Sequence, residues 1–196
     1  EACAILAGPY TVTHHKSTLL IGGMFSFMNA GSGTNQSNHA YKLGPRHHGV
    51  LERGCKTASG SHISWPAHIG AFSLVMGHCA PGTDSSEWPF SYLVEQGSSH
   101  YVIPGITLRG VGTLRDIGKW PARDGRLPQV PQTDRVSFEA FSPYTMGRVF
   151  RARITLEELS GRFDADTQEI TWNGLRLKEK SVKQGIEWYR LALDRY

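Results

Sequence analysis

Aliphatic residues recur at every sixth position in the middle of this chain, and this spacing constrains the fold more than any other feature. Counting by six from Leu51 gives Thr57, Ile63, Ile69, Val75 and Pro81. Four of these six positions are aliphatic. Such a period is typical of a parallel β-helix, because each short side points one aliphatic side chain inward and successive coils satisfy each other's backbone hydrogen bonds. The alternative is chance alternation in an antiparallel β-sandwich.

Weaker signs of the same period extend toward the N-terminus. One register runs through Leu6, Val12 and Thr18, and another links Ile21 to Phe27. Glycine makes up 22 of 196 residues, which is well above the usual share of about 7%. This composition favours a turn-rich β protein over a helical bundle. We therefore predict a mainly β fold with a parallel β-helix.

The residue composition and patterning change twice along the chain, which predicts three regions. Residues 1–118 form the expected β-helix domain, residues 119–140 a proline-containing extended connector, and residues 141–196 a small α+β cap. The cap begins with Ser142-Pro143, a helix-start signature, followed by Met146, Val149, Phe150 and Ile154 at helical spacing. Asn173-Gly174 predicts a hairpin turn. In the last helix we expect Ser181 as the N-cap and place Val182, Ile186, Tyr189 and Leu193 on one face.

A polar segment between residues 29 and 49 carries most of the candidate chemistry. Because it has little apolar content, it is either a mobile loop or a preorganised ligand surface. His39 and His47 are the candidate general bases, since histidine titrates near neutrality. The candidate substrate-binding residues in this segment are Asn35, Asn38, Lys42 and Arg46. The two cations suit a phosphate or carboxylate, and the two amides suit a sugar or a carbonyl.

Two further polar stretches, residues 53–62 and 76–85, add the candidate substrate-binding residues Lys56, Ser61 and His78. With three six-residue sides to a coil, residues 18 apart would stack, which predicts one column of Lys42, Gly60 and His78. A metal site built from His39, His47, His62 and His78 is the weaker hypothesis, because the sequence has no HExxH spacing. We therefore predict no metal.

Aromatic residues have a simpler interpretation as packing groups. Trp65 and Trp88 are expected to pack in or against the solenoid, since tryptophan buries a large apolar area, although a stacking platform for a base is the alternative. Trp172, Trp188 and Tyr189 are expected to attach the C-terminal cap to its neighbour.

Charge and cysteine content exclude several classes of protein. The net charge of +4 is too small to indicate a nucleic-acid partner, and no apolar run is long enough for a membrane span. Three cysteines without CxxC spacing argue against a disulfide or zinc scaffold and suggest free thiols in a reducing cytoplasm. The absence of an initiating Met suggests a processed or truncated piece of a longer protein.

Several longer motifs resemble a bacterial family known only as a domain of unknown function. They include Gly33-Thr-Asn-Gln-Ser-Asn-His-Ala-Tyr-Lys-Leu-Gly-Pro, Glu52-Arg-Gly-Cys-Lys-Thr-Ala-Ser-Gly-Ser, Phe72-Ser-Leu-Val-Met-Gly-His and Trp172-Asn-Gly-Leu-Arg-Leu-Lys. That family is similar to hexapeptide-repeat proteins with a left-handed β-helix, the architecture of trimeric acyltransferases and of part of the sugar-nucleotide pyrophosphorylases. The resemblance implies a left-handed parallel β-helix with a C-terminal helical cap, and a trimer or dimer.

From these observations we expect a transferase-like protein acting on an activated sugar or acyl donor. His39 would accept a proton from an acceptor hydroxyl or amine, while Lys42 and Arg46 would hold the phosphate of acyl-CoA or of a sugar nucleotide. Neither donor is firmly implied as a cofactor. The alternative is a non-catalytic sugar- or nucleotide-binding or assembly module, in which the polar side chains are satisfied within their own loop.

Overall fold

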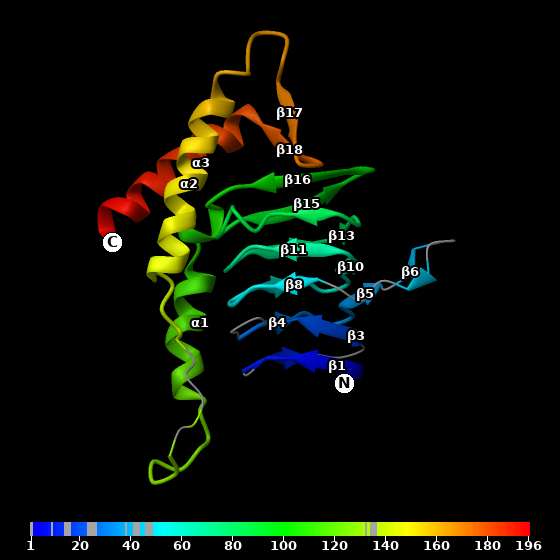
Figure 1. The fold of residues 1–196 in the computed structure, drawn as a ribbon, viewed down its shortest axis with the longest axis vertical. Coiled ribbons are helices and arrows are strands. Elements are labelled where there is room, and N and C mark those ends of the chain that lie inside the picture. Colours follow the sequence, from blue (N-terminus) through cyan, green and yellow to red (C-terminus); the bar gives the residue numbers. More distant parts are fainter. Residues whose placement is uncertain are drawn as a thin grey trace.

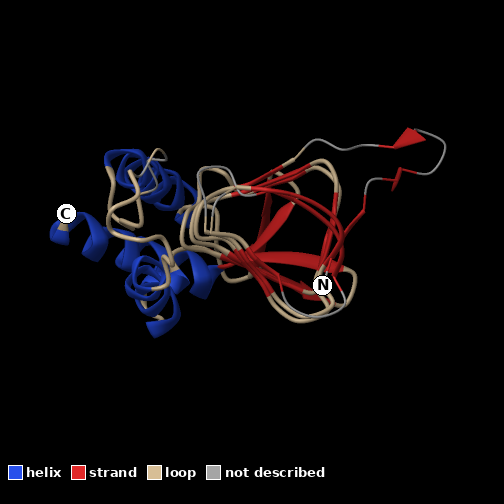
Figure 2. Ribbon diagram, turned by 90° about the horizontal axis from the view of Figure 1, so that it is seen from below, coloured by secondary structure: helices blue, strands red, loops and turns tan. Residues whose placement is uncertain are grey.

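Parallel β-strands stacked into a solenoid form the larger part of the chain, and helices lie along one side of it (Figure 1). The computed structural model describes residues 2–8, 10–13, 17–22, 27–37, 39–40, 44–45, 49–131, 133 and 137–196. Seen along its axis, the solenoid has three sides (Figure 2). The predicted parallel β-helix is thereby confirmed.

Each side of the solenoid is a sheet of short strands. One side contains β5 (Asn35–Ser37), β10 (His62–Ser64) and β13 (His78–Cys79), and the next contains β8 (Val50–Leu51), β11 (Ala67–Ile69) and β14 (Thr83–Asp84). The parallel strands of the third side are β2 (Val12–Thr13), β4 (Asn29–Ala30), β9 (Lys56–Thr57), β12 (Leu74–Met76) and β15 (Tyr92–Gln96). β1 (Ala2–Ala7) pairs in parallel with β3 (Ser17–Gly22), and β6 (His39–Ala40) pairs antiparallel with β7 (Gly44–Pro45).

Coil length differs from one coil to the next, as the strand register shows. On the third side Val75 pairs with Thr57 before it and with Leu93 after it, so these two coils are equally long. On the first side the step from His62 to its partner His78 is shorter than that repeat, whereas the step from Asn35 to its partner His62 is longer. The extra residues of the longer coil lie between β5 and β8, where β6 extends away from the solenoid (Figures 1 and 2).

The six-residue spacing marks the interior, as expected. Leu51, Ile63, Ile69 and Val75 are each at most 1% exposed, and Thr57 points inward with them. Trp65 and Trp88 are fully buried in the same core, which confirms their interpretation as packing groups. The spacing ends at the exposed Pro81, and Thr83 is the buried residue of that coil.

A helix that the sequence did not predict follows the last coil. The short helix η1 (Ile106–Leu108) comes first, and α1 (Val111–Ala122) follows it. α1 runs across residue 118, where we expected the β-helix domain to end. No side chain caps its N-terminus at Gly110, and Pro121 lies in its last turn. The helix forms because tertiary contacts hold it: Trp120 is buried, and Asp116 pairs with Lys56 of the solenoid.

The C-terminal region contains the predicted helices, with two corrections. In α2 (Pro143–Ser160) the Ser142 hydroxyl caps the N-terminus as expected, and Met146 and Val149 are buried. Phe150 and Ile154, assigned to the same face, are exposed, because the packed face continues through Ala152, Leu156 and Leu159. In α3 (Glu179–Arg195) Val182 and Tyr189 are buried as expected, but the N-cap is Lys178, so the prediction of Ser181 was wrong.

A hairpin closes the end of the solenoid. β16 (Ser99–Ile103) folds back antiparallel on β15, and β18 (Leu175–Lys178) pairs with β16 and with β17 (Glu169–Trp172). Asn173 and Gly174 form the predicted turn, both with positive φ. Trp172 stacks on Trp88 with ring centroids 4.3 Å apart, and Tyr189 contacts the last coil, so these residues attach the cap as predicted. In the described part of the chain, no helix has the length and apolar character needed to cross a bilayer.

Candidate functional site

Three histidines form a column on the outer face of the solenoid, on the side away from the helices. Alternation along β10 buries Ile63 and turns His62 and Ser64 outward. The ring of His62 lies 5.4 Å from that of His78, and the ring of His78 lies 5.5 Å from that of His100 on β16, each pair edge to face. Asn35 is the register partner of His62 on the preceding coil. We call His62, His78 and His100 the histidine column.

A serine and a histidine of this face are in direct hydrogen-bond contact. The Ser64 hydroxyl lies 2.9 Å from Nε2 of His78. With a neutral ring protonated on Nδ1, His78 accepts the serine proton at Nε2, which is the geometry of a hydroxyl beside its general base. Glu95 Oε2 accepts the backbone N–H of His78 at 2.9 Å and so fixes the turn that carries the ring.

One ring of the column is held uncharged, and two of its rings carry unpaired nitrogens. Burial, and then the neighbouring His78, lower the pKa of His62, so this ring is neutral at pH 7. Two ring nitrogens, Nε2 of His62 and Nδ1 of His100, are buried and have no hydrogen-bond partner among the described residues. Buried polar atoms are normally paired, and the described residues contain other exceptions, such as Oε2 of Glu52, so these nitrogens alone do not define the site.

The polar segment predicted to carry the chemistry enters this face at β5. Asn35 is in the column's register, and the extra residues of that coil follow it. His39 is described only as backbone in β6, where it pairs with Pro45. The candidates Asn38, Lys42, Arg46 and His47 lie outside the described residues.

The predicted column of Lys42, Gly60 and His78 was wrong. His78 stacks on His62 because the coil on this side is shorter than the assumed repeat, and the extra residues after Asn35 shift the earlier register. Sequence reasoning therefore found Asn35 and His78 but gave His62 no role beyond the metal hypothesis and missed Ser64 and His100. The alternation His62-Ile63-Ser64 next to a six-residue aliphatic position was the available signal.

Two other candidates make internal contacts. Lys56 pairs with Asp116 of α1 and donates to the Gly112 carbonyl at 3.3 Å. The Ser61 side chain is fully buried and donates to the Val75 carbonyl at 3.0 Å. Both residues therefore hold neighbouring parts of the fold together.

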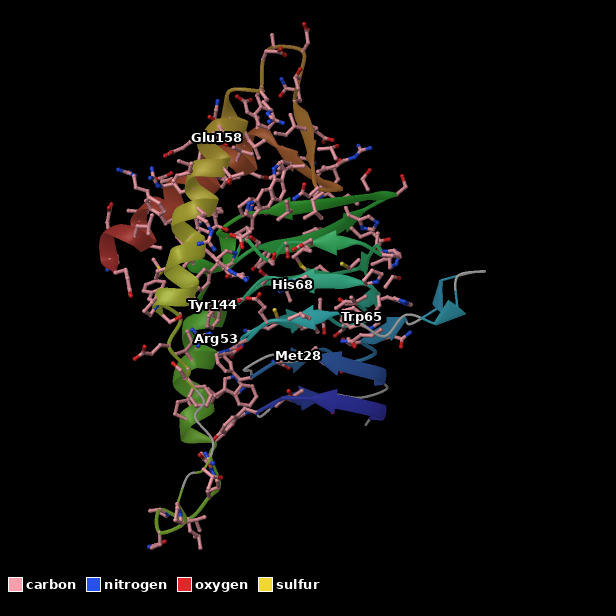
Figure 3. All side chains as sticks on the ribbon, in the orientation of Figure 1. Met28, Arg53, Trp65, His68, Tyr144 and Glu158 are labelled. Atoms are coloured by element: carbon pink, nitrogen blue, oxygen red, sulfur yellow. The ribbon has the colours of Figure 1, made fainter. Side chains whose placement is uncertain are left out.

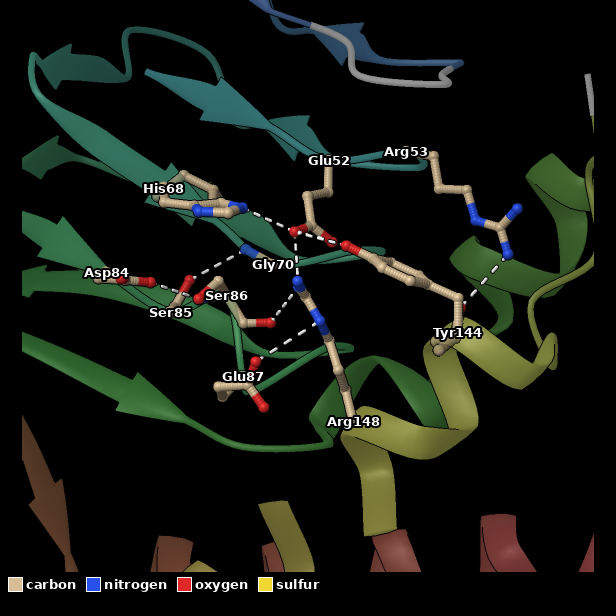
Figure 4. A network of polar contacts seen from close by, with 12 residues as sticks. Glu52, Arg53, His68, Gly70, Asp84, Ser85, Ser86, Glu87, Tyr144 and Arg148 are labelled. Carbon is tan, nitrogen blue, oxygen red and sulfur yellow. Dashed lines mark hydrogen bonds and ion pairs between the residues drawn. The ribbon is translucent and has the colours of Figure 1, made fainter. Parts of the chain in front are cut away.

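A second polar cluster lies where the solenoid meets α2 (Figures 3 and 4). Oε1 of the buried Glu52 accepts hydrogen bonds from His68 Nε2 at 2.6 Å, from Arg148 Nη1 at 2.5 Å and from the Tyr144 hydroxyl at 3.1 Å. Burial tends to raise the pKa of Glu52, but the hydrogen bond from His68 and the charge of Arg148 outweigh it and hold the pKa below its usual value.

The charges of this second cluster are already paired. Arg148 also donates to the Ser86 carbonyl at 2.6 Å, and Arg151 pairs with Glu87 at 2.8 Å. Each contact joins α2 to a solenoid turn, so the cluster docks the helix. The histidine column is the better candidate site because none of its contacts among the described residues docks a helix on the solenoid.

A metal is not supported by the described residues. They contain no group of three or more histidine, cysteine, aspartate or glutamate side chains placed to hold an ion. Two thiols, those of Cys55 and Cys79, are free and buried. Burial raises the pKa of Cys79 to about 11 and that of Cys55 still further, so neither thiol is a nucleophile at neutral pH.

The solenoid, its outward histidine column and the docked helices define a β-solenoid protein with a polar outer face. Within that class, the chain belongs to the family described as "Domain of unknown function (DUF4954)", whose model matches residues 1–160. The match therefore covers the solenoid and extends through the last residue of α2. Comparison with curated proteins finds no match.

Proposed function

We propose that this protein is a group transferase in which His78 is the general base. The observation that carries the proposal is the 2.9 Å contact between Nε2 of His78 and a hydroxyl, that of Ser64. An imidazole already within hydrogen-bond distance of a hydroxyl is placed to take the proton of an acceptor hydroxyl bound at the same face. The neutral neighbour His62 and the amide of Asn35 offer further polar groups for a sugar.

The donor in this proposal is an activated acyl group or an activated sugar. With acyl-CoA, the acceptor oxygen loses its proton to His78, bonds to the thioester carbon and expels the thiolate, which is then protonated. Lys42 and Arg46 hold the donor phosphates, Asn38 orients the sugar, and His39 and His47 are the candidates for a second proton-transfer group. Kinship with left-handed hexapeptide-repeat acyltransferases, an oligomer with shared sites and a cytoplasmic location belong to the same proposal.

The test is a turnover assay with the purified chain. Acyl-CoA donors and nucleotide sugars are each incubated with a panel of sugars and amines, and products are identified by mass spectrometry. We expect His78→Asn to lower turnover about 100-fold or more, the usual contribution of a general base. The matched control is His100→Asn, in the same column but without the serine contact, and it should retain most activity. Equal activity of the native protein and His78→Asn would refute the role of His78.

A non-catalytic binding module is the second candidate function. The internal contacts of Lys56 and Ser61 favour it, because they show predicted ligand groups engaged in holding the fold. A sugar or nucleotide sugar that raises the melting temperature without any turnover would support this module and contradict the transferase.

A further inference from the structure

An apolar pocket of about 550 Å³ lies between the helices and the last coil of the solenoid. The helices lie on the opposite side of the solenoid from β10 and β13, which carry His62 and His78 (Figure 1). The walls of the pocket come from Phe90 of the last coil, from η1 and α1, from the segment before α2, and from α3. A volume in this range is typical of small-molecule sites. The pocket is therefore separate from the proposed transferase site, and a ligand assigned to it does not depend on the transferase proposal.

The walls offer a ligand mainly hydrocarbon and aromatic surface. Leu108, Phe141, Trp188 and Leu191 line the pocket. Leu191 is 48% exposed, so part of this apolar wall is open to the solvent. The Thr107 hydroxyl, also in the lining, already donates to the Phe72 carbonyl at 3.0 Å. The walls therefore suit an alkyl chain better than a polar ligand such as a nucleobase or a sugar.

The charged residues of the described lining are both arginines. Arg109 follows η1 and Arg195 ends α3, and both residues are exposed. Neither side chain has a hydrogen bond or ion pair with another described residue, and the described lining contains no acidic residue. Two cations beside an apolar slot are complementary to an amphipathic anion, since the chain enters the slot and the anionic head stays at the charged edge.

We propose that this pocket binds a fatty carboxylate. Its alkyl chain packs against Phe141, Trp188 and Leu191, and its carboxylate is held by Arg109 and Arg195. A neutral lipid would leave the arginines without a role, and a nucleotide would find few hydrogen-bond partners on the walls. Apolar walls and a cationic edge together thus select one class of ligand.

The experiment compares decanoate with decanol, two probes that differ in the charge of the head group. Affinity is measured by isothermal titration calorimetry on the purified chain, below the concentration at which the probes aggregate. We expect decanoate to bind more tightly than decanol. The double variant Arg109→Gln/Arg195→Gln should weaken decanoate about tenfold and leave decanol unchanged, since exposed charge contacts contribute modestly. Arg190→Gln, on α3 but outside the described lining, is the matched control.

A second variant tests the walls without depending on the arginines. Leu191→Glu adds a negative charge at an exposed wall position and should abolish decanoate binding, while circular dichroism and the melting temperature confirm that the chain is folded. Equal affinity for the two probes, or no binding of either, would overturn the proposal. So would binding that survives Leu191→Glu, because the ligand would then lie elsewhere.

Discussion

Arg148 of α2 places its Nη1 2.5 Å from Oε1 of Glu52, a solenoid residue far earlier in the chain. The Glu52 side chain is only 2% exposed, and its second oxygen, Oε2, is buried without a partner among the described residues. A buried carboxylate is tolerated only when it is paired, so this contact couples the position of the helix to the stability of the coil.

Replacing Arg148 by Met should therefore destabilise the protein strongly. The substitution leaves a buried carboxylate without its cation, which costs about 3–5 kcal/mol in comparable cases. Urea unfolding followed by circular dichroism measures the change. Adding Glu52→Gln to Arg148→Met should restore part of the loss, because the unpaired charge is then removed.

A surface ion pair on the same helix supplies the control for that measurement. Arg153 lies 2.6 Å from Glu157 in an i,i+4 pair whose glutamate is well exposed. Arg153→Met should cost no more than about 0.5 kcal/mol. Equal losses for Arg148→Met and Arg153→Met would mean that the Glu52 pair does not hold the helix in place.

The neutral His62 makes stability depend on pH. Its pKa is lower in the folded protein than in the unfolded chain, so the unfolded chain binds the proton more readily. Above the pKa of histidine in the unfolded chain, about 6.5, this ring does not lower the free energy of unfolding. As the pH falls below that pKa, protonation of the unfolded chain lowers the free energy of unfolding. We expect the melting temperature to fall between pH 7.5 and pH 5, and to fall less in His62→Asn.

The pH range of this measurement distinguishes the effect of His62 on stability from that of Glu52. The pKa of Glu52 is lowered, so its contribution is lost only as the pH falls below the usual glutamate value of about 4.5. Measurements above pH 5 therefore report chiefly on histidine. An unchanged slope in His62→Asn would show that other groups carry the dependence.

The solenoid could be predicted from the sequence because its signal is local. One aliphatic residue on each short side repeats along the chain, and Leu51, Ile63, Ile69 and Val75 indeed point inward. Helix α1 could not be predicted in the same way, since Asp116 pairs with Lys56 of a distant coil and Trp120 is buried by packing that the local sequence does not show.

The candidate site was predictable only in part for a related reason. A stacking rule with one fixed coil length cannot give the column, because coil length differs from one coil to the next. Asn35 and His78 were named from their residue types, but their common neighbour His62 is found only once strands are paired. In the sequence, Lys56 and Ser61 are polar candidates like the residues of the histidine column. Only the packing of the fold shows that these two residues make internal contacts.

Close contact between coils makes Gly31 sensitive to substitution. A Cβ built at this position would lie 2.6 Å from the Thr57 carbonyl oxygen of the next coil, and backbone cannot yield as a side chain can. We expect Gly31→Ala to cost about 1–3 kcal/mol in chemical unfolding, as overpacked sites do. Gly118→Ala in α1 is the control, since no atom lies within 4 Å of its Cβ, and it should stabilise the helix by about 0.5–1 kcal/mol. An equal loss at both positions would contradict the coil contact as the cause, because a Cβ at Gly118 meets no such neighbour.

Tyr189 fastens α3 to the last coil of the solenoid. The side chain is fully buried, and its hydroxyl donates to the Pro89 carbonyl at 2.7 Å. Tyr189→Phe keeps the ring but removes the shorter hydrogen bond to that carbonyl and leaves only the Ser91 hydroxyl, at 3.4 Å, so we expect a loss of about 1 kcal/mol. Tyr101→Phe, which removes an exposed hydroxyl bonded to Glu169 at 3.0 Å, should cost less than about 0.5 kcal/mol. Because the Tyr189 contact joins cap and solenoid, tryptophan fluorescence and circular dichroism should shift together in Tyr189→Phe. Two separate transitions would instead mean that the cap and the solenoid unfold independently.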